Sequence, residues 1–575
     1  MPNKIKIESR PLTHPYLTAD MPDLLKRIYA GRGIQSLDEL NFNLASLIPF
    51  NQLNNTDKAA NRLFTALKQQ QRITIVGDFD ADGATSTALA IKALQAFGFQ
   101  FIDYLVPSRF KDGYGLSKGV VDIAHQQQNP DLIITVDNGI SSIEGVAQAN
   151  QYQIDVLVTD HHLAGQQLPQ ACVIVNPNMP NDSFPSKALA GVGVIFYVML
   201  ALRSLLREQN WFINHPEPNM AELLDLVALG TVADVVSLDQ NNRILVSQGM
   251  RRIKAGVCCA GITALLEVAG RNPTNLATSD LGFAVAPRLN AAGRLESMSL
   301  GIDCLLETDS NTAREYALQL QDLNKERQEI EQQMRQEAIK YIEYLEINQQ
   351  KELPLGLCLY SRDWHQGVIG IVASRIKDRH HRPVVAFATG DKDQIKGSCR
   401  SIQGVHIRDV LERIANQNPN LIIKFGGHAM AAGLTLLEKN YATFEQQFDK
   451  VVREYIDPTA LEAKLMTDGH LQPAEMTIQM ATLLRDAAPW GQHFPAPLFE
   501  GCFKVIKQHI LASKHIKLVL KPLDYDLWID AIAFNQAEDL SNDLDQIRIV
   551  YKMDINEYRG NIKLQLIIDY IEPII

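Results

Sequence analysis

Asp78, Asp80 and Asp82 occupy every second position of the segment GDFDADG, directly after the apolar run at 73–76. The run has the pattern of a buried strand and residues 84–94 have that of a helix, so the three acids are expected where the strand ends. Ligands of an open α/β sheet bind at that edge, and three adjacent carboxylates repel one another unless a cation neutralises them. The spacing therefore predicts a divalent metal site, with a solvated acidic turn as the alternative.

Three further apolar stretches end in side chains that can bind a metal. These stretches, with the polar residues that follow them, are 132–136 with Asp137, 156–158 with Asp160, His161 and His162, and 223–232 with Asp234. Four acid-bearing ends indicate one shared edge of the fold, although an adjacent histidine pair can also be an ordinary turn. Oxygen ligands with one or two imidazoles and no thiolate suit manganese or magnesium better than a structural zinc site.

These motifs, in this order, resemble those of the DHH phosphoesterase superfamily. The matching motifs are GDFDADG, DNG at 137–139, DHH at 160–162 and the later Asp234. Further segments resemble the branch of that superfamily that degrades single-stranded DNA from its 5′ end: VPSRFKDGYGLS at 106–117, APRLNAAGR at 286–294, WHQGVIGIVASR at 364–375, GSCRS at 397–401 and FGGHAMAAG at 425–433. The resemblance extends over nearly the whole chain from about residue 20. This ordered set is far more specific than DHH alone.

The resemblance implies two divalent ions, Mn²⁺ or Mg²⁺, that activate water for phosphodiester hydrolysis without a covalent nucleophile. Asp80 would bind the first ion and Asp82 the second, and Asp137 would bridge both. His161 and Asp234 would complete the second site.

His162 would contact the phosphate or assist proton transfer, as the last of the implied catalytic residues. One position departs from the family pattern, because many relatives have a metal-binding histidine where this sequence has Val76. Asp78 is the nearest candidate to replace that ligand. The alternative is that Asp78 accepts a hydrogen bond that orients a neighbouring ligand.

A second set of motifs, between 364 and 433, suits the binding of a terminal phosphate. The glycine pair and histidine of FGGH offer unobstructed backbone N–H groups beside an imidazole, and GSCRS adds a hydroxyl and a planar cationic fork. A tight turn is the alternative for the glycine pair. Together with residues that the resemblance places near DNA, the expected substrate-binding set is Arg109, Arg288, Asn290, His365, Ser398, Arg400, Gly426, Gly427 and His428.

The composition is that of a globular protein of several domains, with 575 residues, 46% of them hydrophobic and 21% charged. The first residues lack the basic-then-apolar order of a signal peptide, and no apolar run reaches membrane-spanning length, so a cytoplasmic protein is expected. Seven cysteines without a CxxC pair indicate reduced thiols rather than a disulfide framework or a zinc ribbon.

The formal net charge of −11 argues at first against a nucleic-acid partner, because phosphate binding relies on lysine and arginine. The distribution of charge matters more, since bound ions offset the acids of a metal site. Basic residues gather near the motifs: Arg109, Lys111, Arg288, Arg294, Lys396, Arg400, Arg408 and Lys424. A focused basic groove on an acidic protein is therefore expected.

The apolar periodicity predicts an α/β protein in which a long helix joins a mainly parallel-sheet catalytic domain to a smaller α/β domain, followed by a C-terminal OB-like β-barrel. The expected ranges are 1–60 for an N-terminal helical buttress, 61–308 for the catalytic domain, 309–348 for the connecting helix, 349–458 for the substrate-binding domain and 459–575 for the barrel. Short helices are expected at 22–30 and within 37–50. For the connecting helix an oligomerising coiled coil is the alternative, but polar residues interrupt its seam.

The resemblance implies a single-stranded-DNA-specific 5′ to 3′ exonuclease that releases mononucleotides in DNA recombination and repair. A phosphoesterase of small nucleotides or oligoribonucleotides is the enzymatic alternative, but a small substrate has no use for the barrel. A non-catalytic replication scaffold is the other alternative, but it should have lost the carboxylates. The implied partners are a 5′ end of single-stranded DNA, a RecQ-type helicase and a single-strand-binding protein, with no membrane, and a monomer is expected.

Overall fold

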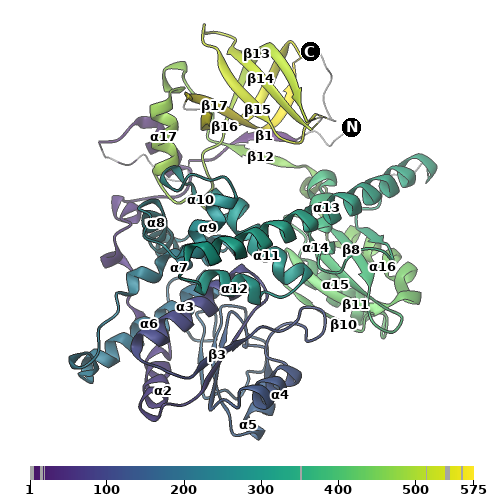
Figure 1. Cartoon of the computed structure of the whole chain (residues 1–575). Helices are drawn as coiled ribbons and strands as arrows, with labels where there is room; N and C mark the ends of the chain where they lie inside the picture. The colour runs from purple at the N-terminus through teal and green to yellow at the C-terminus, as the bar shows by residue number, and fades with distance from the viewer. Residues whose placement is uncertain are drawn as a thin grey trace. The chain divides into compact units, whose positions relative to one another are not determined.

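The computed structural model describes residues 5–12, 17, 20–349, 353–512, 514–537, 544–558 and 561–574. The chain divides into two compact units, and Figure 1 labels many of their elements. The first unit consists of residues 9–324 and 467–575, and the second unit consists of residues 1–8 and 325–466.

The first unit is built on a five-stranded parallel sheet in the order β3-β2-β4-β5-β6. Its strands are β2 (Ile73–Gly77), β3 (Ile102–Leu105), β4 (Leu132–Val136), β5 (Asp155–Thr159) and β6 (Val173–Val175). In the register of the sheet, Gly77 lies beside Val136, and Val136 lies beside Thr159. These three strands end level, so the residues that follow them emerge at one edge.

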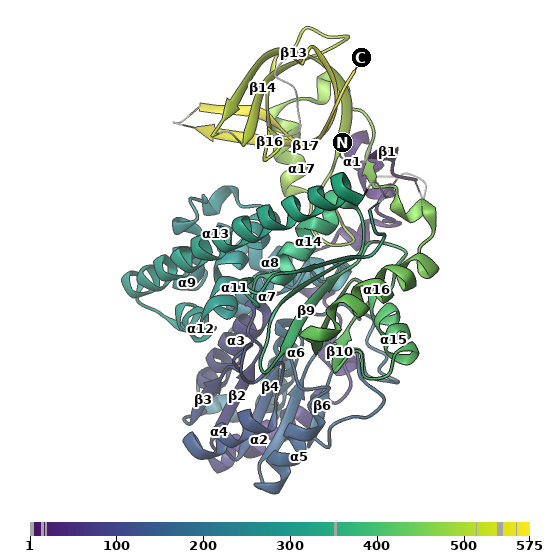
Figure 2. The ribbon, with the colours of Figure 1, turned by 90° about the vertical axis from the view of Figure 1, so that its right-hand side faces the viewer.

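Helices cover both faces of this sheet, so that alternate strand residues are buried on opposite sides. The helices of one face are α2 (Thr56–Gln69), α3 (Ala81–Phe97) and α6 (Gly191–Glu208), and those of the other are α4 (Lys118–Gln127) and α5 (Ile143–Gln151). Ile73 and Ile75 belong to the first core and Val76 to the second. Figure 2 shows α4 and α5 beside the sheet. Burial on both faces explains the continuous apolar runs and confirms the predicted parallel-sheet domain.

A helical segment follows the sheet. Its helices are α7 (Leu224–Ala233), α8 (Gln240–Lys254), α9 (Ala260–Val268), α10 (Thr278–Asp280), the π-helical turn η7 (Leu281–Val285), α11 (Ala286–Leu295) and α12 (Ser299–Leu306). The apolar stretch 223–232, which the sequence pattern groups with three strand ends, forms helix α7, so Asp234 comes from the end of a helix. Almost every residue of α7 is buried, which removes the amphipathic pattern that distinguishes a helix from a strand.

The N-terminal region contains one of its two expected helices, α1 (Asp23–Ala30). The expectation of a helix within 37–50 is wrong, because the segment forms separate 3₁₀ turns, namely η1 (Leu37–Leu40), η2 (Leu44–Ser46) and η3 (Phe50–Gln52). Asn41 and Asn43 are extended, and the side chain of Asn41 accepts the backbone N–H of Asn43 at 3.1 Å. Such local side-chain bonds compete with a helical backbone.

A single helix of 40 residues, α13 (Ser310–Gln349), begins in the first unit and ends in the second, so the predicted connecting helix is confirmed. Ala313 and Leu320 are buried in its first half, and Met334 and Ala338 are buried in its second half. Neither α13 nor any other helix in the described ranges has the length and hydropathy needed to cross a bilayer.

The second unit is built on a mixed five-stranded sheet in the order β10-β11-β9-β8-β7. Its strands are β7 (Leu357–Tyr360), β8 (Val384–Thr389), β9 (Gln394–Arg400), β10 (Lys424–Gly427) and β11 (Ala431–Leu437). Strands β7 and β8 are parallel, and the other neighbours are antiparallel. Its helices are α14 (Ile369–His380), α15 (Ile407–Gln417) and α16 (Tyr441–Tyr455). This sheet confirms the predicted smaller α/β domain.

The C-terminal strands close into a barrel in the order β13-β14-β15-β17-β16 (Figure 1). They are β13 (Phe499–Leu511), β14 (His515–Pro522), β15 (Ile529–Ala533), β16 (Gln546–Tyr558) and β17 (Asn561–Pro573), and helix α17 (Ile478–Asp486) precedes them. Ile516, Leu518 and Leu520 alternate along β14 with more exposed residues and fill the barrel interior. The predicted barrel is confirmed.

Residues early in the chain are tied to residues near 467. Strand β1 (Lys6–Ser9) pairs with β12 (Lys464–Thr467). Arg32 forms a bidentate ion pair with Asp468, with distances of 2.8 and 3.0 Å, and both side chains are buried. Tyr29 on α1 also stacks on Trp490. The N-terminal region of the first unit is therefore fixed by residues far away in the sequence.

Candidate active site

The predicted metal-binding and catalytic residues converge at the edge where β2, β4 and β5 end. Their ligand atoms lie within 4.8 Å of one another in three groups, namely Asp137 with His161 and His162, Asp82 with His161 and Asp234, and Asp78 with Asp80 and Asp137. Asp137 and His161 each belong to two groups. The groups therefore overlap and form one site, which we call the aspartate cluster.

The loop between β2 and α3 places the first three aspartates. Asp80 is the N-cap of α3, and its Oδ1 accepts the N–H groups of Asp82 and Gly83, both at 3.0 Å. Asp82 therefore lies in the first helical turn, because the helix begins earlier than its apolar pattern indicates. A Cβ atom at Gly83 would lie 2.4 Å from the carbonyl oxygen of Asp78, so only glycine permits this tight turn.

Asp82 is held at the N-terminus of α6. Its Oδ2 accepts the N–H of Gly191 at 2.7 Å, and its Oδ1 accepts the N–H of Val192 at 3.0 Å. The positive end of the helix dipole stabilises a carboxylate at this position. A Cβ atom at Gly191 would lie 2.5 Å from Cβ of Asp137, so this glycine lets α6 approach both aspartates.

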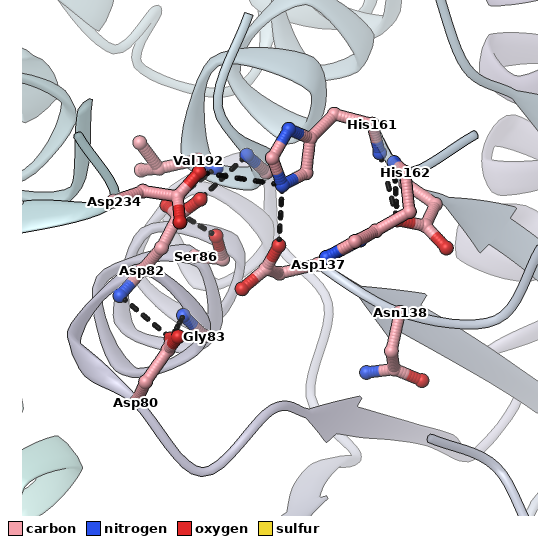
Figure 3. Close-up of polar contacts among 12 residues, drawn as sticks. Asp80, Asp82, Gly83, Ser86, Asp137, Asn138, His161, His162, Val192 and Asp234 are labelled. Carbon is pink, nitrogen blue, oxygen red and sulfur yellow. Dashed lines mark hydrogen bonds and ion pairs between the residues drawn. The ribbon is translucent and has the colours of Figure 1, made fainter. Parts of the chain in front are cut away.

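The ring of His161 points between Asp137 and Asp234, as Figure 3 shows. Its Nε2 lies 3.0 Å from Oδ1 of Asp137 and 3.5 Å from Oδ2 of Asp234. One ring nitrogen and two carboxylate oxygens thus face a common point, and these are donor atoms that a single divalent cation can share.

Asp160, to which the sequence pattern assigns no role, fixes the histidine pair. Its Oδ1 accepts the backbone N–H groups of His161 and His162 at 2.7 and 3.1 Å and lies 2.8 Å from Nδ1 of His162. Burial lowers the pKa of His162, but the hydrogen bond and charge of Asp160 outweigh burial and raise the pKa to about 9. The contact with Asp160 therefore favours the protonated form of His162. The available sequence signal was the aspartate itself, which directly precedes two histidines at a strand end.

Tyr114 is a second residue of the site to which the sequence pattern assigns no role. Its hydroxyl donates to the backbone carbonyl of Asp137 at 3.1 Å and lies 3.0 Å from Nδ1 of His162. The phenol therefore joins the strand end that carries Asp137 to the imidazole of His162. Its only sequence signal was membership of the segment VPSRFKDGYGLS.

The carboxylates of the aspartate cluster repel one another. Burial and the charge of Asp80 raise the pKa of Asp82 to about 7. Burial, followed by neighbouring carboxylates, raises the pKa of three further acids well above the usual value: Asp78, Asp137 and Asp234. Within the described ranges the five aspartates Asp78, Asp80, Asp82, Asp137 and Asp234 form no ion pair with a lysine or arginine. Carboxylate oxygens with an imidazole fit Mn²⁺ or Mg²⁺, which would relieve the repulsion.

The structure also bears on the unusual Val76. Its side chain is fully buried in the core on the α4 side of the sheet, away from the aspartate cluster. Oδ1 of Asp78 is buried and accepts no hydrogen bond from any residue that the structure describes. Such an oxygen, beside Asp80 and Asp137, fits a metal ligand better than an acceptor that orients a neighbour.

Two residues at the cluster have left-handed backbone conformations. The φ angle is +61° at Asp137 and +58° at Val235, which follows Asp234. Positive φ is particularly unfavourable for a β-branched residue such as valine. Strain of roughly 1–3 kcal/mol per residue persists mainly at functional sites, where the surrounding fold enforces it.

Of the predicted DNA-contacting residues, Arg109 lies beside the loop that carries the aspartates. Its guanidinium lies 3.9 Å from the ring centroid of Phe79, and its Nε donates to the carbonyl oxygen of Gly293 at 3.2 Å. A cation held against the loop in this way is suited to attract a phosphate.

Asn290 and Arg288 lie on α11, and both contact protein groups. Oδ1 of Asn290 accepts the N–H of Ala81, the first residue of α3, at 2.8 Å. Arg288 donates to the carbonyl oxygen of Ala284. Asn290 thus positions the aspartate-bearing loop, a role that the sequence did not indicate. Contacts of Asn290 and Arg288 with DNA remain predictions.

In the second unit, Ser398 and Arg400 lie on the same face of β9. Nη1 of Arg400 donates to Oγ of Ser398 at 3.1 Å and to the carbonyl oxygen of Cys399 at 2.8 Å. A Cβ atom at Gly370, the second residue of α14, would lie 2.9 Å from both Nη2 of Arg400 and Oγ of Ser398. The positive N-terminal end of α14 therefore lies against this pair.

Glycines leave the adjoining part of this sheet bare. Gly426 pairs with Gly433, and Gly433 pairs with Ser398, so the three residues align across β10, β11 and β9. A Cβ atom at Gly426 would meet nothing within 4 Å. His428 is exposed just after β10, and Nδ1 of His365, before α14, accepts the N–H of Gly367 at 3.1 Å. The second unit thus offers an open surface beside a serine, an arginine and a helix N-terminus.

Three family models match the chain in separate segments. The model "DHH family, N-terminal domain" matches residues 72–231, "DHHA1 domain" matches residues 355–456, and "RecJ OB domain" matches residues 467–570. The first contains most of the aspartate cluster, the second contains Ser398 and Arg400, and the third contains all of the barrel except the end of β17.

Relatives of known activity match over nearly the full length. The chain is 54% identical to the single-stranded-DNA-specific exonuclease RecJ of Escherichia coli strain K12, over 97% of each chain. It is 52% identical to the protein of the same name from Haemophilus influenzae, over 96% of each chain. Among solved structures, RecJ of Thermus thermophilus in complex with Mn²⁺ has a TM-score of 0.79 at 27% identity, with 99% of this chain and 79% of that chain covered. The Mg²⁺ complex has a TM-score of 0.74 at 26% identity, with 99% and 78% covered.

Proposed function

The chain belongs to the RecJ family of single-stranded-DNA-specific exonucleases, and on that premise we propose that it releases mononucleotides from the 5′ end of single-stranded DNA. The reaction is a metal-dependent phosphodiester hydrolysis that serves DNA recombination and repair. The sequence identity of more than 50% to known exonucleases, over nearly the full length of each chain, carries this conclusion. The aspartate cluster supplies the chemistry that the conclusion requires.

The cofactors are two divalent ions, Mn²⁺ or Mg²⁺, for which the aspartate cluster provides the donors. We assign Asp78 and Asp80 to one ion and Asp82, His161 and Asp234 to the other, with Asp137 shared. This assignment is supported by the grouping of the donor atoms and by the raised pKa values, which indicate that nearby positive charges such as Arg109 do not offset the burial and mutual repulsion of the acids. When bound, such ions act as Lewis acids towards water and the phosphate.

We assign to His162 the transfer of a proton to the leaving oxygen. Its raised pKa supports the role, because an imidazole with a pKa of about 9 holds its proton at neutral pH. Asp160 keeps this imidazole charged, and Tyr114 limits its rotation by holding the same ring. The imidazolium also contributes positive charge where the phosphodiester carries negative charge.

We place in the second unit the residues that set the 5′ to 3′ direction of degradation. A 5′-terminal phosphate would accept hydrogen bonds from Ser398, from Arg400 and from the backbone at the N-terminus of α14. The absence of side chains at Gly426 and Gly427 leaves room for the terminal nucleotide. His365 and His428 flank this surface and are the remaining candidates for phosphate contacts.

A division of labour among domains completes the proposal. Residues 1–60 support the catalytic domain at 61–308, residues 309–348 connect it to a 5′-end-binding domain at 349–458, and residues 459–575 bind the DNA strand. The three family matches fall inside the catalytic, substrate-binding and barrel ranges, which supports these boundaries. We further propose that the protein acts in the cytoplasm as a monomer, together with a RecQ-type helicase that supplies single strands and a single-strand-binding protein.

The test is hydrolysis of 5′-labelled oligonucleotides with Mn²⁺ or Mg²⁺, in single-stranded and duplex form, beside a cyclic dinucleotide. We expect labelled mononucleotides from the single strand alone. Asp137→Ala should be inactive, whereas Asp103→Ala, which removes an exposed carboxylate on β3, should retain activity. Hydrolysis of the cyclic dinucleotide without release from single strands would contradict the proposal.

A further inference from the structure

Within the first unit, one helical segment joins the barrel to the aspartate cluster. The segment starts at the 3₁₀ turn η6 (Pro273–Asn275), where Nδ2 of Asn275 donates to Oε1 of Glu557 on β16 at 2.6 Å. It ends with α11, where Oδ1 of Asn290 accepts the N–H of Ala81, the first residue of α3. A DNA strand that runs from the cluster to the barrel therefore has its shortest route along this segment.

Phe283 lies in the middle of the segment, on the π-helical turn η7, and its ring is in solvent. The residue is 84% exposed, the highest value among the large hydrophobic residues that the structure describes. The neighbouring side chains of the turn, Leu281, Ala284 and Val285, are buried. A firmly packed turn thus presents one aromatic ring to water, and π-helical turns occur frequently at functional sites.

The turn η7 packs against the end of α7, close to Asp234. A Cβ atom at Gly282 would lie 3.3 Å from Cγ1 of Val232, which is two positions before Asp234. Along the helical segment Phe283 is seven positions before Asn290, or about 10 Å at a rise of about 1.5 Å per residue. This length corresponds to about three stacked nucleotides at about 3.4 Å each. The ring is therefore a few nucleotides away from the aspartate cluster.

Arg288 provides positive charge on the same segment. Its Nη1 donates to the carbonyl oxygen of Ala284, and its Nε is buried without an acceptor among the described residues. Asp280, which directly precedes η7, pairs instead with Arg271, with 3.3 Å between Oδ1 and Nε. In the part of the chain that the structure describes, no carboxylate oxygen lies within 4.0 Å of the Arg288 guanidinium. An aromatic ring and an arginine along one track are the groups that bind the bases and the backbone of a single strand.

The ring of Phe283 has no hydrogen-bonding group, so its contact with DNA is limited to the face of a base. Inside a duplex, neighbouring base pairs cover both faces of each base. In a single strand a base can turn outwards and stack on an aromatic side chain, whatever its sequence. A stacking contact at Phe283 is therefore available to unpaired strands and not to the interior of a duplex.

We propose that Phe283 stacks on one base of the DNA strand, a few nucleotides from the scissile phosphate, and thereby favours single strands over duplex. This inference rests on the proposed exonuclease function and names a residue that contributes to its substrate specificity. The contact lies on the catalytic domain, apart from the barrel and from the surface around Arg400.

Fluorescence anisotropy of the full-length protein with 5′-phosphorylated strands tests the contact, with a chelator present to prevent hydrolysis. Phe283→Ala should weaken binding of single strands roughly five- to a hundredfold, the range for loss of one base–aromatic stack. Phe283→Trp should retain the affinity, and Phe283→Leu should retain only part of it. The affinity for blunt duplex should not change. Phe101→Ala is the matched control, because this exposed ring precedes β3 at the end of the parallel sheet opposite to the cluster.

Single strands with one abasic position locate the stacked base. In the unmodified protein, removal of one base a few nucleotides from the 5′ end should weaken binding. In Phe283→Ala the same abasic strand should bind as well as the intact strand, because both changes remove the same contact. In hydrolysis with Mn²⁺ the variant should have a raised KM and a nearly unchanged kcat. Thermal melting and a calorimetric Mn²⁺ titration confirm that the variant is folded and binds metal.

Unchanged affinity of folded Phe283→Ala for single strands overturns the inference. So does an equal loss for duplex, or a loss that adds to that of every abasic position. The binding assay does not depend on hydrolysis, so a protein that shows the expected stacking but releases no mononucleotides contradicts the proposed function alone.

Discussion

The aspartate cluster and the surface around Arg400 are prepared for their ligands in opposite ways. Asp137 is 2% exposed and lies in a strained backbone among acids whose pKa values are raised. Arg400 is only partly buried, already donates to Ser398 and borders bare glycines. The carboxylates of the cluster repel one another until a cation binds, whereas the surface presents hydrogen-bond donors that are already oriented for an anion. Loss of one group should therefore disable the first site and merely weaken the second.

The largest effect is expected for Asp137, which contacts both halves of the cluster. Asp137→Ala should reduce kcat/KM on single-stranded DNA roughly a thousandfold or more, because it removes a shared ligand and with it several kcal/mol of charge stabilisation. Asp82→Ala should also abolish hydrolysis. Substantial activity of Asp137→Ala at saturating Mn²⁺ would show that this residue is not shared between the ions.

Replacement of the two histidines should impair different steps, metal binding for His161 and turnover for His162. His161→Ala should lose Mn²⁺ affinity in a calorimetric titration, because its Nε2 faces Asp137 and Asp234. His162→Ala should retain the metal and lose roughly a hundredfold in kcat, as expected for a proton donor. Equal losses of metal affinity in the two variants would refute this division.

A variant of Arg400 tests the second region of the comparison, the surface around Arg400. Arg400→Ala should weaken binding of 5′-phosphorylated strands on the order of ten- to a hundredfold, with a shallower salt dependence, because a charge-assisted hydrogen bond is lost. Metal affinity should not change. Arg413→Ala, which removes an exposed arginine on α15 outside the set of basic residues near the motifs, is the matched control.

Fluorescence anisotropy with phosphorylated and hydroxyl-ended strands, at two salt concentrations, measures this effect. An identical loss for both ends would mean that Arg400 only follows the DNA backbone. The source of polarity would then have to be sought at Arg109 or Arg288.

The smallest expected effect is a dependence of folding stability on pH in the metal-free protein. The pKa of Asp82 in the folded protein is about 7, above the value of about 4 for an unfolded chain. The folded state therefore binds more protons at Asp82 between these values, so the contribution of Asp82 favours folding most below about pH 4 and is lost as pH rises towards 7. Asp78, Asp137 and Asp234 shift in the same direction.

Differential scanning calorimetry with a chelator should show a melting temperature lower at pH 7.5 than at pH 5.5, by on the order of a few degrees. Saturating Mn²⁺ should raise the melting temperature more at pH 7.5 than at pH 5.5. Asp137→Asn removes one of the crowded charges and should flatten the dependence. A metal-free protein that is more stable at the higher pH would contradict the electrostatic account of the cluster.

Much of the cluster could be predicted because Asp78, Asp137 and His161 follow short strands of one parallel sheet. Alternation and connection length place such strand ends together without any knowledge of side-chain packing. Asp234 was harder to place in the fold, because α7 is buried on nearly all sides and its apolar run resembles a strand.

Other contacts depend on packing between distant elements and left no local signal. Asn290 reaches Ala81 across 209 positions, and no pattern near either residue indicates the bond. The segment 37–50 has enough apolar residues for a helix, but the side chain of Asn41 satisfies the backbone locally instead. Roles such as that of Asn290 become visible only when the tertiary structure is known.

The ion pair between Arg32 and Asp468 has a consequence for how the protein is made. Its partners are separated by 436 positions, and the Arg32 side chain has no exposed surface once it is paired. At a translation rate of about 5–20 residues per second, Arg32 is synthesised roughly 20–90 s before Asp468. During that interval α1 lacks its partners Asp468 and Trp490, so this early helix of the nascent chain stays accessible to chaperones and proteases until the C-terminal part is made.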